Sequence, residues 1–155
     1  EYDKYQNAFM VDSRYNKETT YNELIKLTYE LSKHNISFFR DEEAFASLNE
    51  NIISRMVNLD VPEIRAWVPA CATGQEAYSI GMLLSEALEK VGSNKTFRIF
   101  ATDISEESIN FASAGIYHPE LFSELKGNYK EKYFYPVDEN RIRVHPRLRS
   151  RISFF

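Results

Sequence analysis

A turn of small residues is the part of the sequence best suited to chemistry. Hydrophobic residues 64–68 run into the turn 69–74 (PACATG), and an amphipathic segment begins at Gln75. Small residues at the start of a helix let a ligand approach the backbone, as in the nucleotide sites of α/β proteins. Asp103 ends a second hydrophobic segment, 29 residues after Gly74, where its carboxylate can accept hydrogen bonds from ribose hydroxyls. Together these residues predict a site for an adenosine-containing cofactor.

The same turn argues against phosphate binding. Its spacing matches neither the dinucleotide fingerprint nor the phosphate loop, and no lysine follows Gly74. Glu76 lies in the first turn of the expected helix, where a carboxylate would repel a phosphate but suits a cationic or hydroxyl-bearing ligand. Simpler roles stay open for both acids. Asp103 could be a helix cap that competes with Ser105, and Glu76 could merely stabilise the helix dipole.

Alternating hydrophobic patterns indicate the elements that must position these residues. The order strand, helix, strand, helix between residues 64 and 115 predicts a parallel sheet and therefore an α/β fold. Asp41 and Ser105 are expected to cap helices, and Gly115 is expected to end the second of these. The predicted helices are 20–33, 41–57, 75–91, 105–115, 120–125 and 129–134, and the predicted strands are 64–68, 97–102, 141–144 and 151–155.

Composition limits the classes of function. The 155 residues suit one domain, and a net charge of −4 argues against a nucleic-acid partner. The charge is uneven, because residues 126–155 carry +5 and the rest −9. That basic stretch is either a solvated face or a patch for an acidic partner. The single cysteine, Cys71, excludes an internal disulfide, and no metal-ligand cluster is visible. Without a signal peptide or a long apolar run, we expect a cytoplasmic protein with no membrane insertion.

Four short motifs carry a resemblance to a known family. They are residues 38–41 (FFRD), 68–80 (VPACATGQEAYSI), 101–104 (ATDI) and 114–117 (AGIY), in that order along the chain. The chain resembles the CheR family of chemoreceptor glutamate methyltransferases, which use S-adenosylmethionine. The resemblance covers about residues 36–155. It implies a Rossmann-like methyltransferase fold, preceded by a short helical N-terminal segment and linker over residues 1–35.

The resemblance also implies roles for individual residues. Asp103 would bind the ribose of S-adenosylmethionine, and Arg40 would lie beside the reacting groups as the catalytic residue. The other expected cofactor contacts are Ser37, Ala70, Thr73, Gly74 and Glu76. On the sequence alone, Arg40 could instead be a surface residue at the start of a helix. Phe38 and Phe39 are expected to be packing residues.

Methyl transfer to a glutamate needs few catalytic groups. The receiving carboxylate is already ionised at neutral pH, so no general base is required. Alignment and exclusion of water can supply the rate. The absence of an obvious catalytic histidine is therefore compatible with this chemistry.

The sequence departs from the family in two places. The family usually has Thr four residues before Arg40 and a polar residue two positions earlier, where this chain has Ile36 and His34. Asn35 and Ser37 could supply the polar contacts from shifted positions. The Asn-Leu and Cys-Arg-Asn segments that follow in the family are not present. We therefore expect residues 36–155 to be the front part of a truncated methyltransferase domain.

Three functions remain after this comparison. The first is methylation of glutamate side chains on a chemoreceptor or related signalling protein. The second is a degenerate domain that senses or scaffolds without catalysis, and the third is a methyltransferase for a small molecule. A truncated sheet would also leave an unpaired edge near residues 151–155, which predicts self-association through that strand.

Overall fold

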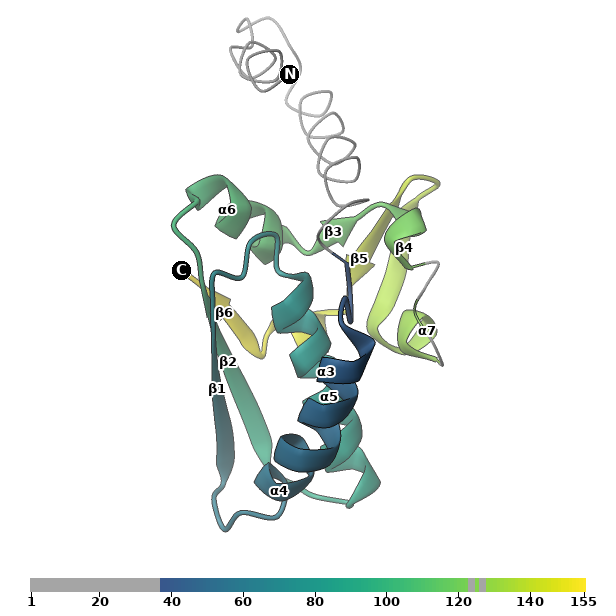
Figure 1. Cartoon of the computed structure of the whole chain (residues 1–155). Helices are drawn as coiled ribbons and strands as arrows, with labels where there is room; N and C mark the ends of the chain where they lie inside the picture. The colour runs from purple at the N-terminus through teal and green to yellow at the C-terminus, as the bar shows by residue number, and fades with distance from the viewer. Residues whose placement is uncertain (1–36, 123–124, 126–127) are drawn as a thin grey trace, which may run out of the picture.

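The computed structural model describes residues 37–122, 125 and 128–155 (Figure 1). The helix expected over 20–33 and the segment 1–35 lie outside these residues. The described helices are α3 (Glu42–Leu48), η1 (Asn49–Ile53), α4 (Ser54–Met56), α5 (Gln75–Lys90), α6 (Glu106–Ala114), η2 (Pro119–Phe122), α7 (Tyr129–Tyr133) and α8 (Pro146–Arg149). The strands are β1 (Glu63–Pro69), β2 (Thr96–Thr102), β3 (Ile116–Tyr117), β4 (Phe134–Asp138), β5 (Arg141–Val144) and β6 (Ile152–Phe154).

A parallel sheet of order β1-β2-β6 forms one part of the molecule. The register pairs Ile64 with Phe97 and Val68 with Ala101, so both strands end at the same edge. Both strands were predicted from the sequence, as were α5 between them and α6 after them. The predicted α/β fold is thus confirmed, and it is a Rossmann-like arrangement of strand, helix and strand.

Alternation along the strands separates a buried face from one that is largely exposed in β1 and half-buried in β2. Ile64, Val68, Ile99 and Ala101 are buried in the core together with inward side chains of α5. Trp67 alternates with Val68 and is 69% exposed on the other face. Helix α5 and the α3–α4 segment lie beside the sheet in Figure 1. This period of two is the pattern expected of strands whose one face is packed.

One helical segment runs from Glu42 to Met56 and contains a π-helical turn, η1. Its cap is the one predicted, because the Asp41 side chain accepts a hydrogen bond of 3.0 Å from the backbone N–H of Ala44. Glu42 and Glu43 in the first turn complement the helix dipole. The predicted helix over 41–57 is confirmed, and the π turn in its middle is an addition that the pattern did not indicate.

A second, antiparallel sheet of order β3-β5-β4 corrects the expectation for the region after Gly115. We expected a turn over 117–119, but Tyr117 lies in β3. The helix predicted over 129–134 is confirmed as α7, which ends at Tyr133 because Phe134 begins β4. The strand predicted over 141–144 is confirmed as β5. Strand β4 was not predicted, because it contains Pro136 and a proline argues against a strand. Proline cannot donate a ladder hydrogen bond and is tolerated at a sheet edge, which is where β4 lies. The helix expected over 120–125 is a short 3₁₀ turn, η2, as far as Phe122. Helix α8 was not predicted.

An aromatic cluster joins the second sheet to the rest of the molecule. The Phe38 ring lies 5.2 Å from that of Tyr117, 5.0 Å from that of Phe122 and 5.3 Å from that of Phe134, between ring centroids. Phe39 packs against Phe45 with 5.2 Å between centroids. The expectation that Phe38 and Phe39 are packing residues therefore agrees with the structure.

The two outer strands of the parallel sheet are β1 and β6. Self-association through the segment 151–155 stays a prediction, with β6 at the edge as expected. Among the described helices, none is both long and apolar enough to cross a membrane. Over the same residues, no cluster of His, Cys, Asp and Glu side chains could hold a metal ion.

Candidate functional site

The turn between β1 and α5 has an unusual backbone. Ala70 and Ala72 have φ values of 52° and 45°, and Gly74 has a φ of 92°. Residues other than glycine seldom adopt this left-handed region, so the turn must be held by its surroundings. It is anchored by hydrogen bonds from the Cys71 N–H to the Thr102 carbonyl at 3.0 Å and from the Gly74 N–H to the Cys71 carbonyl at 2.9 Å.

Gly74 is required by close packing as well as by its φ. A Cβ placed on it would lie 2.8 Å from the Cβ of Ala112 and 3.2 Å from the hydroxyl oxygen of Tyr117. Helix α6 and strand β3 therefore lie so close to the turn that position 74 has no room for a side chain. The glycine is also the N-cap of α5, in the left-handed conformation and without a side-chain cap.

Asp103 clamps the turn to the end of β2. One carboxylate oxygen accepts a hydrogen bond of 2.8 Å from the Ala72 N–H, and the other accepts one of 2.9 Å from the Ser105 N–H. Ser105, and not Asp103, caps α6, because its hydroxyl accepts from the Ser108 N–H. Each carboxylate oxygen has a further lone pair available, so the half-buried Asp103 can still accept hydrogen bonds from a ligand.

Buried polar groups at the start of α5 fix the rest of the turn. The Thr73 hydroxyl donates to Gln75 Oε1 at 2.7 Å, and the Tyr117 hydroxyl donates to the Thr73 carbonyl at 2.7 Å. Gln75 is completely buried, and its Nε2 has no hydrogen-bond partner among the described residues. The turn is thus held from β2 through Asp103 and from the second sheet through Tyr117.

The segment containing Ser37 and Arg40 lies against the first turns of α5. The backbone N–H of Phe39 donates to the Ser79 hydroxyl at 3.1 Å, and that hydroxyl donates to the Gln75 carbonyl at 2.8 Å. Ser37 is half-buried and Arg40 is exposed, one residue before the cap of α3. This chain of contacts brings the two segments that were predicted to form one site to the same helix.

The remaining charged and reactive groups match a cationic ligand better than an anionic one. Glu76 is exposed in the first turn of α5, with Asp103 across the turn. A helix N-terminus that carries these two carboxylates and no basic side chain disfavours phosphate. Burial, reinforced by the charge of Asp103, raises the pKa of the Cys71 thiol to about 11. Cys71 is therefore a protonated packing residue at neutral pH and no nucleophile.

Comparison with known proteins identifies the cofactor that fits the turn and Asp103. The CheR methyltransferase, SAM binding domain, matches residues 34–155. The chain belongs to the CheR methyltransferase family. S-adenosylmethionine is the cofactor of this domain, and the observed turn fits it. The ligand has a sulfonium cation and a ribose but no phosphate, which agrees with Glu76, with Asp103 and with the absence of a lysine after Gly74.

Several curated proteins resemble the CheR domain described above. A chemotaxis protein methyltransferase of Borreliella burgdorferi is 32% identical over 142 residues, which are 89% of this chain and 50% of that protein. The chemotaxis protein methyltransferase of Escherichia coli is 31% identical over 76% of this chain and 40% of its own length. An uncharacterized 104.1 kDa protein of Rhodobacter capsulatus is 34% identical over 85% of this chain and 14% of its own length. The chain thus spans half or less of these relatives.

The structure places most of the sequence-predicted site residues around one turn. Ala70, Thr73 and Gly74 lie in it, Glu76 follows it and Asp103 is bonded to it. Ser37 and Arg40 are connected to it through Phe39 and α5, and their contacts with a cofactor stay predictions. Three residues that support the turn were not among the predicted site residues: Gln75, Ser79 and Tyr117. Gln75 and Ser79 could have been noticed as polar residues on the inward face of α5, whereas no local signal marks the bond from Tyr117.

Removing the Tyr117 hydroxyl should weaken cofactor binding. In Tyr117→Phe the partly buried Thr73 carbonyl loses its donor, which should lower the free energy of unfolding by about 1–3 kcal/mol and loosen the turn. Tyr133→Phe is a control, because the Tyr133 hydroxyl also donates a partly buried hydrogen bond, of 2.5 Å to Glu86 Oε1, on a part of α5 away from the turn. Urea unfolding should show similar losses for both variants, and titration with S-adenosylmethionine should show weaker binding for Tyr117→Phe alone. Equal affinities would remove Tyr117 from the support of the site.

Proposed function

We propose that the protein carrying this chain transfers methyl groups from S-adenosylmethionine to glutamate side chains of a chemoreceptor or related signalling protein in the cytoplasm. The family match supports the cofactor and the reaction class, and the names of the relatives support a role in chemotaxis. The observation that supports this most strongly is the pair of hydrogen bonds by which Asp103 holds the turn 69–74, because they place a carboxylate beside a helix start that carries Glu76 and no lysine.

The residues of this chain would divide the work of binding. The carboxylate of Asp103 would accept hydrogen bonds from the ribose hydroxyls with its free lone pairs. The turn at Ala70, Thr73 and Gly74 would let the nucleoside approach the backbone, because it carries no bulky side chain. Glu76 would stabilise the positive end of the cofactor electrostatically, and Ser37 would contact it from the adjoining segment.

Catalysis would then depend on positioning and charge. When bound, S-adenosylmethionine supplies an electrophilic methyl group: the glutamate oxygen forms a bond to carbon as the carbon–sulfur bond breaks and its electron pair goes to sulfur. Arg40 would hold the acceptor carboxylate in line with that bond through charged hydrogen bonds. No proton has to be removed, because the acceptor glutamate is ionised at neutral pH.

Methyl transfer from radiolabelled cofactor to purified receptor cytoplasmic domains tests this proposal. The natural protein that carries this chain should label glutamate residues. Arg40→Ala should lower kcat/KM by about 10- to 100-fold, since a charged hydrogen bond contributes ~1.5–3 kcal/mol. Arg55→Ala, on the opposite end of the helical segment, is a control that should leave the rate unchanged. Labelling that is absent, or that is carried by residues other than glutamate, would contradict the proposed substrate.

A degenerate domain without catalysis is the second candidate. The sequence observation that favours it is Ile36, at a position where the family usually has a polar threonine. Such a domain would bind S-adenosylmethionine in the calorimeter and yet transfer no methyl group to any receptor. The labelling experiment therefore separates the two functions, because only the binding step is common to both.

A further inference from the structure

A pocket lies at the end of the parallel sheet opposite to Asp103. Its volume is about 510 Å³, and four cations line it together with one acid: Lys95, Lys132, Arg147, Arg151 and Glu89. Lys95 directly precedes β2 and Arg151 directly precedes β6, whereas Asp103 directly follows β2. The pocket is therefore separate from the candidate cofactor site. A volume of this size is within the range of small-molecule sites.

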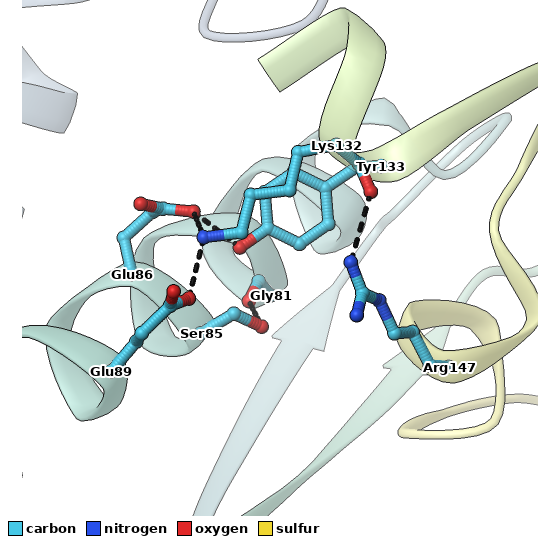
Figure 2. Close-up of polar contacts among 7 residues, drawn as sticks. All are labelled: Gly81, Ser85, Glu86, Glu89, Lys132, Tyr133 and Arg147. Atoms are coloured by element: carbon cyan, nitrogen blue, oxygen red, sulfur yellow. Dashed lines mark hydrogen bonds and ion pairs between the residues drawn. The ribbon is translucent and has the colours of Figure 1, made fainter. Parts of the chain in front are cut away.

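The two lysines of the pocket are held by short contacts with oxygen atoms of the protein. Lys132 Nζ lies 2.7 Å from Glu86 Oε1 and also pairs with Glu89, as Figure 2 shows. These two ion pairs raise the pKa of Lys132 and offset the charge of Glu89. Lys95 Nζ donates to the carbonyl oxygens of Val57 and Leu59 after α4. The main contribution of the two lysines to the pocket is therefore their positive potential, because their N–H donors are already used in part by the protein.

The two arginines retain donors for a ligand. Arg147 makes one long hydrogen bond, of 3.4 Å from Nη2 to the Lys132 carbonyl, and is otherwise exposed. Arg151 stacks above the ring of Phe97 with 5.6 Å between its central carbon and the ring centroid. Stacking on an aromatic face leaves the in-plane N–H groups of a guanidinium open. Each guanidinium has five N–H donors in a planar fork that matches an oxyanion.

Apolar side chains also line the pocket. Leu88, Phe97 and Leu148 line the pocket and are almost completely buried. A ligand with an apolar part could bury that part here, while its charged end meets the arginines. Three of the basic residues in 126–155, a stretch that the sequence suggested is either a solvated face or a patch for an acidic partner, line this pocket: Lys132, Arg147 and Arg151.

We propose that this pocket binds the phosphate group of a small phosphate monoester. The dianionic form of such a group would balance the two guanidinium charges, which a single carboxylate would not. Arg147 and Arg151 would bind the phosphate oxygens, Lys95 and Lys132 would add positive potential, and the apolar wall would contact the esterified group. The site is independent of the proposed methyl transfer, because it shares no residue with the turn 69–74.

Calorimetry with two probes tests the proposal on the full chain. We expect inorganic phosphate to bind at constant ionic strength and phenyl phosphate to bind more tightly, because its ring meets the apolar wall. The double variant Arg147→Gln/Arg151→Gln should weaken both by about tenfold or more. Equal affinity for the two probes would assign the pocket to free phosphate and contradict the ester.

Two further variants separate the site from general charge effects. Arg65→Gln/Arg141→Gln removes the same total charge from surface pairs with Glu63 and Asp138 and should leave phosphate affinity unchanged. Arg147→Lys/Arg151→Lys keeps the charge but loses the planar fork, so it should also bind phosphate more weakly, and it serves if the glutamine variant fails to fold. Absence of phosphate binding in the unmodified chain, or an equal loss in the Arg65/Arg141 variant, would overturn the proposal.

Discussion

Replacing Asp103 by alanine should weaken S-adenosylmethionine binding by about 10- to 100-fold, since charged hydrogen bonds contribute ~1.5–3 kcal/mol. The effect has two sources. The variant loses the acceptor proposed for the ribose, and it releases the N–H groups of Ala72 and Ser105. The second loss should also lower the free energy of unfolding by about 1–3 kcal/mol. Calorimetric titration and urea unfolding of the same preparations measure the two effects.

Asp103→Asn separates the charge from the clamp. Its amide oxygen can still accept from one backbone N–H, but its NH2 group cannot accept from the other, so only part of the stability should return, while the loss of charge should keep cofactor affinity low. Ser105→Ala is the structural control, because it removes the cap of α6 without touching the carboxylate. It should lower stability by about 1 kcal/mol and leave affinity unchanged. If Asp103→Ala binds the cofactor as tightly as the unmodified protein, Asp103 is not in the site.

Replacing Gly74 by alanine should be the most destabilising change in the turn. The left-handed φ of 92° costs an alanine about 1–2 kcal/mol. The new Cβ would lie 2.8 Å from the Cβ of Ala112 and 3.2 Å from the hydroxyl oxygen of Tyr117. This clash should add about 1–3 kcal/mol, because Ala112 and Tyr117 are both buried in the packed core. The methyl group should also displace α6 or β3 from the turn, so cofactor binding should fall with stability. Thermal unfolding and cofactor titration measure both.

Gly92 provides the matched control for this prediction. Its φ is 61°, but a Cβ on it would have no neighbour within 4 Å. Gly92→Ala should therefore show only the backbone cost of about 1–2 kcal/mol and no change in cofactor affinity. Equal losses of stability in the two variants would show that packing around Gly74 is looser than the structure indicates.

Much of the first half of this fold could be predicted because local patterns and packing agree. The buried alternation of β1 and β2, the inward stripe of α5 and the caps at Asp41 and Ser105 all correspond to short stretches of sequence. The end of β2 also placed Asp103 correctly, since parallel strands of one sheet present their carboxyl ends at one edge.

Only part of the second sheet could be predicted: strand β5 matches the strand predicted over 141–144, whereas β3 and β4 were missed for physical reasons. Strand β3 has only two residues, so no period can be seen, and β4 contains Pro136 at the edge of its sheet. The second sheet is stabilised by contacts between residues far apart in the sequence, such as the contact of Phe38 with Phe134. The bond from Tyr117 to Thr73, which are 44 residues apart, likewise depends on tertiary packing that single-sequence patterns do not encode.

Titration of the natural protein with S-adenosylmethionine, S-adenosylhomocysteine and ATP tests the central claim most directly. All three ligands contain adenosine, but only ATP carries phosphates, which Glu76 at the start of α5 should repel. We predict saturable binding of the first two at one site and no binding of ATP there. Failure of S-adenosylmethionine to bind at millimolar concentration, or tighter binding of ATP at the turn 69–74, would contradict the account.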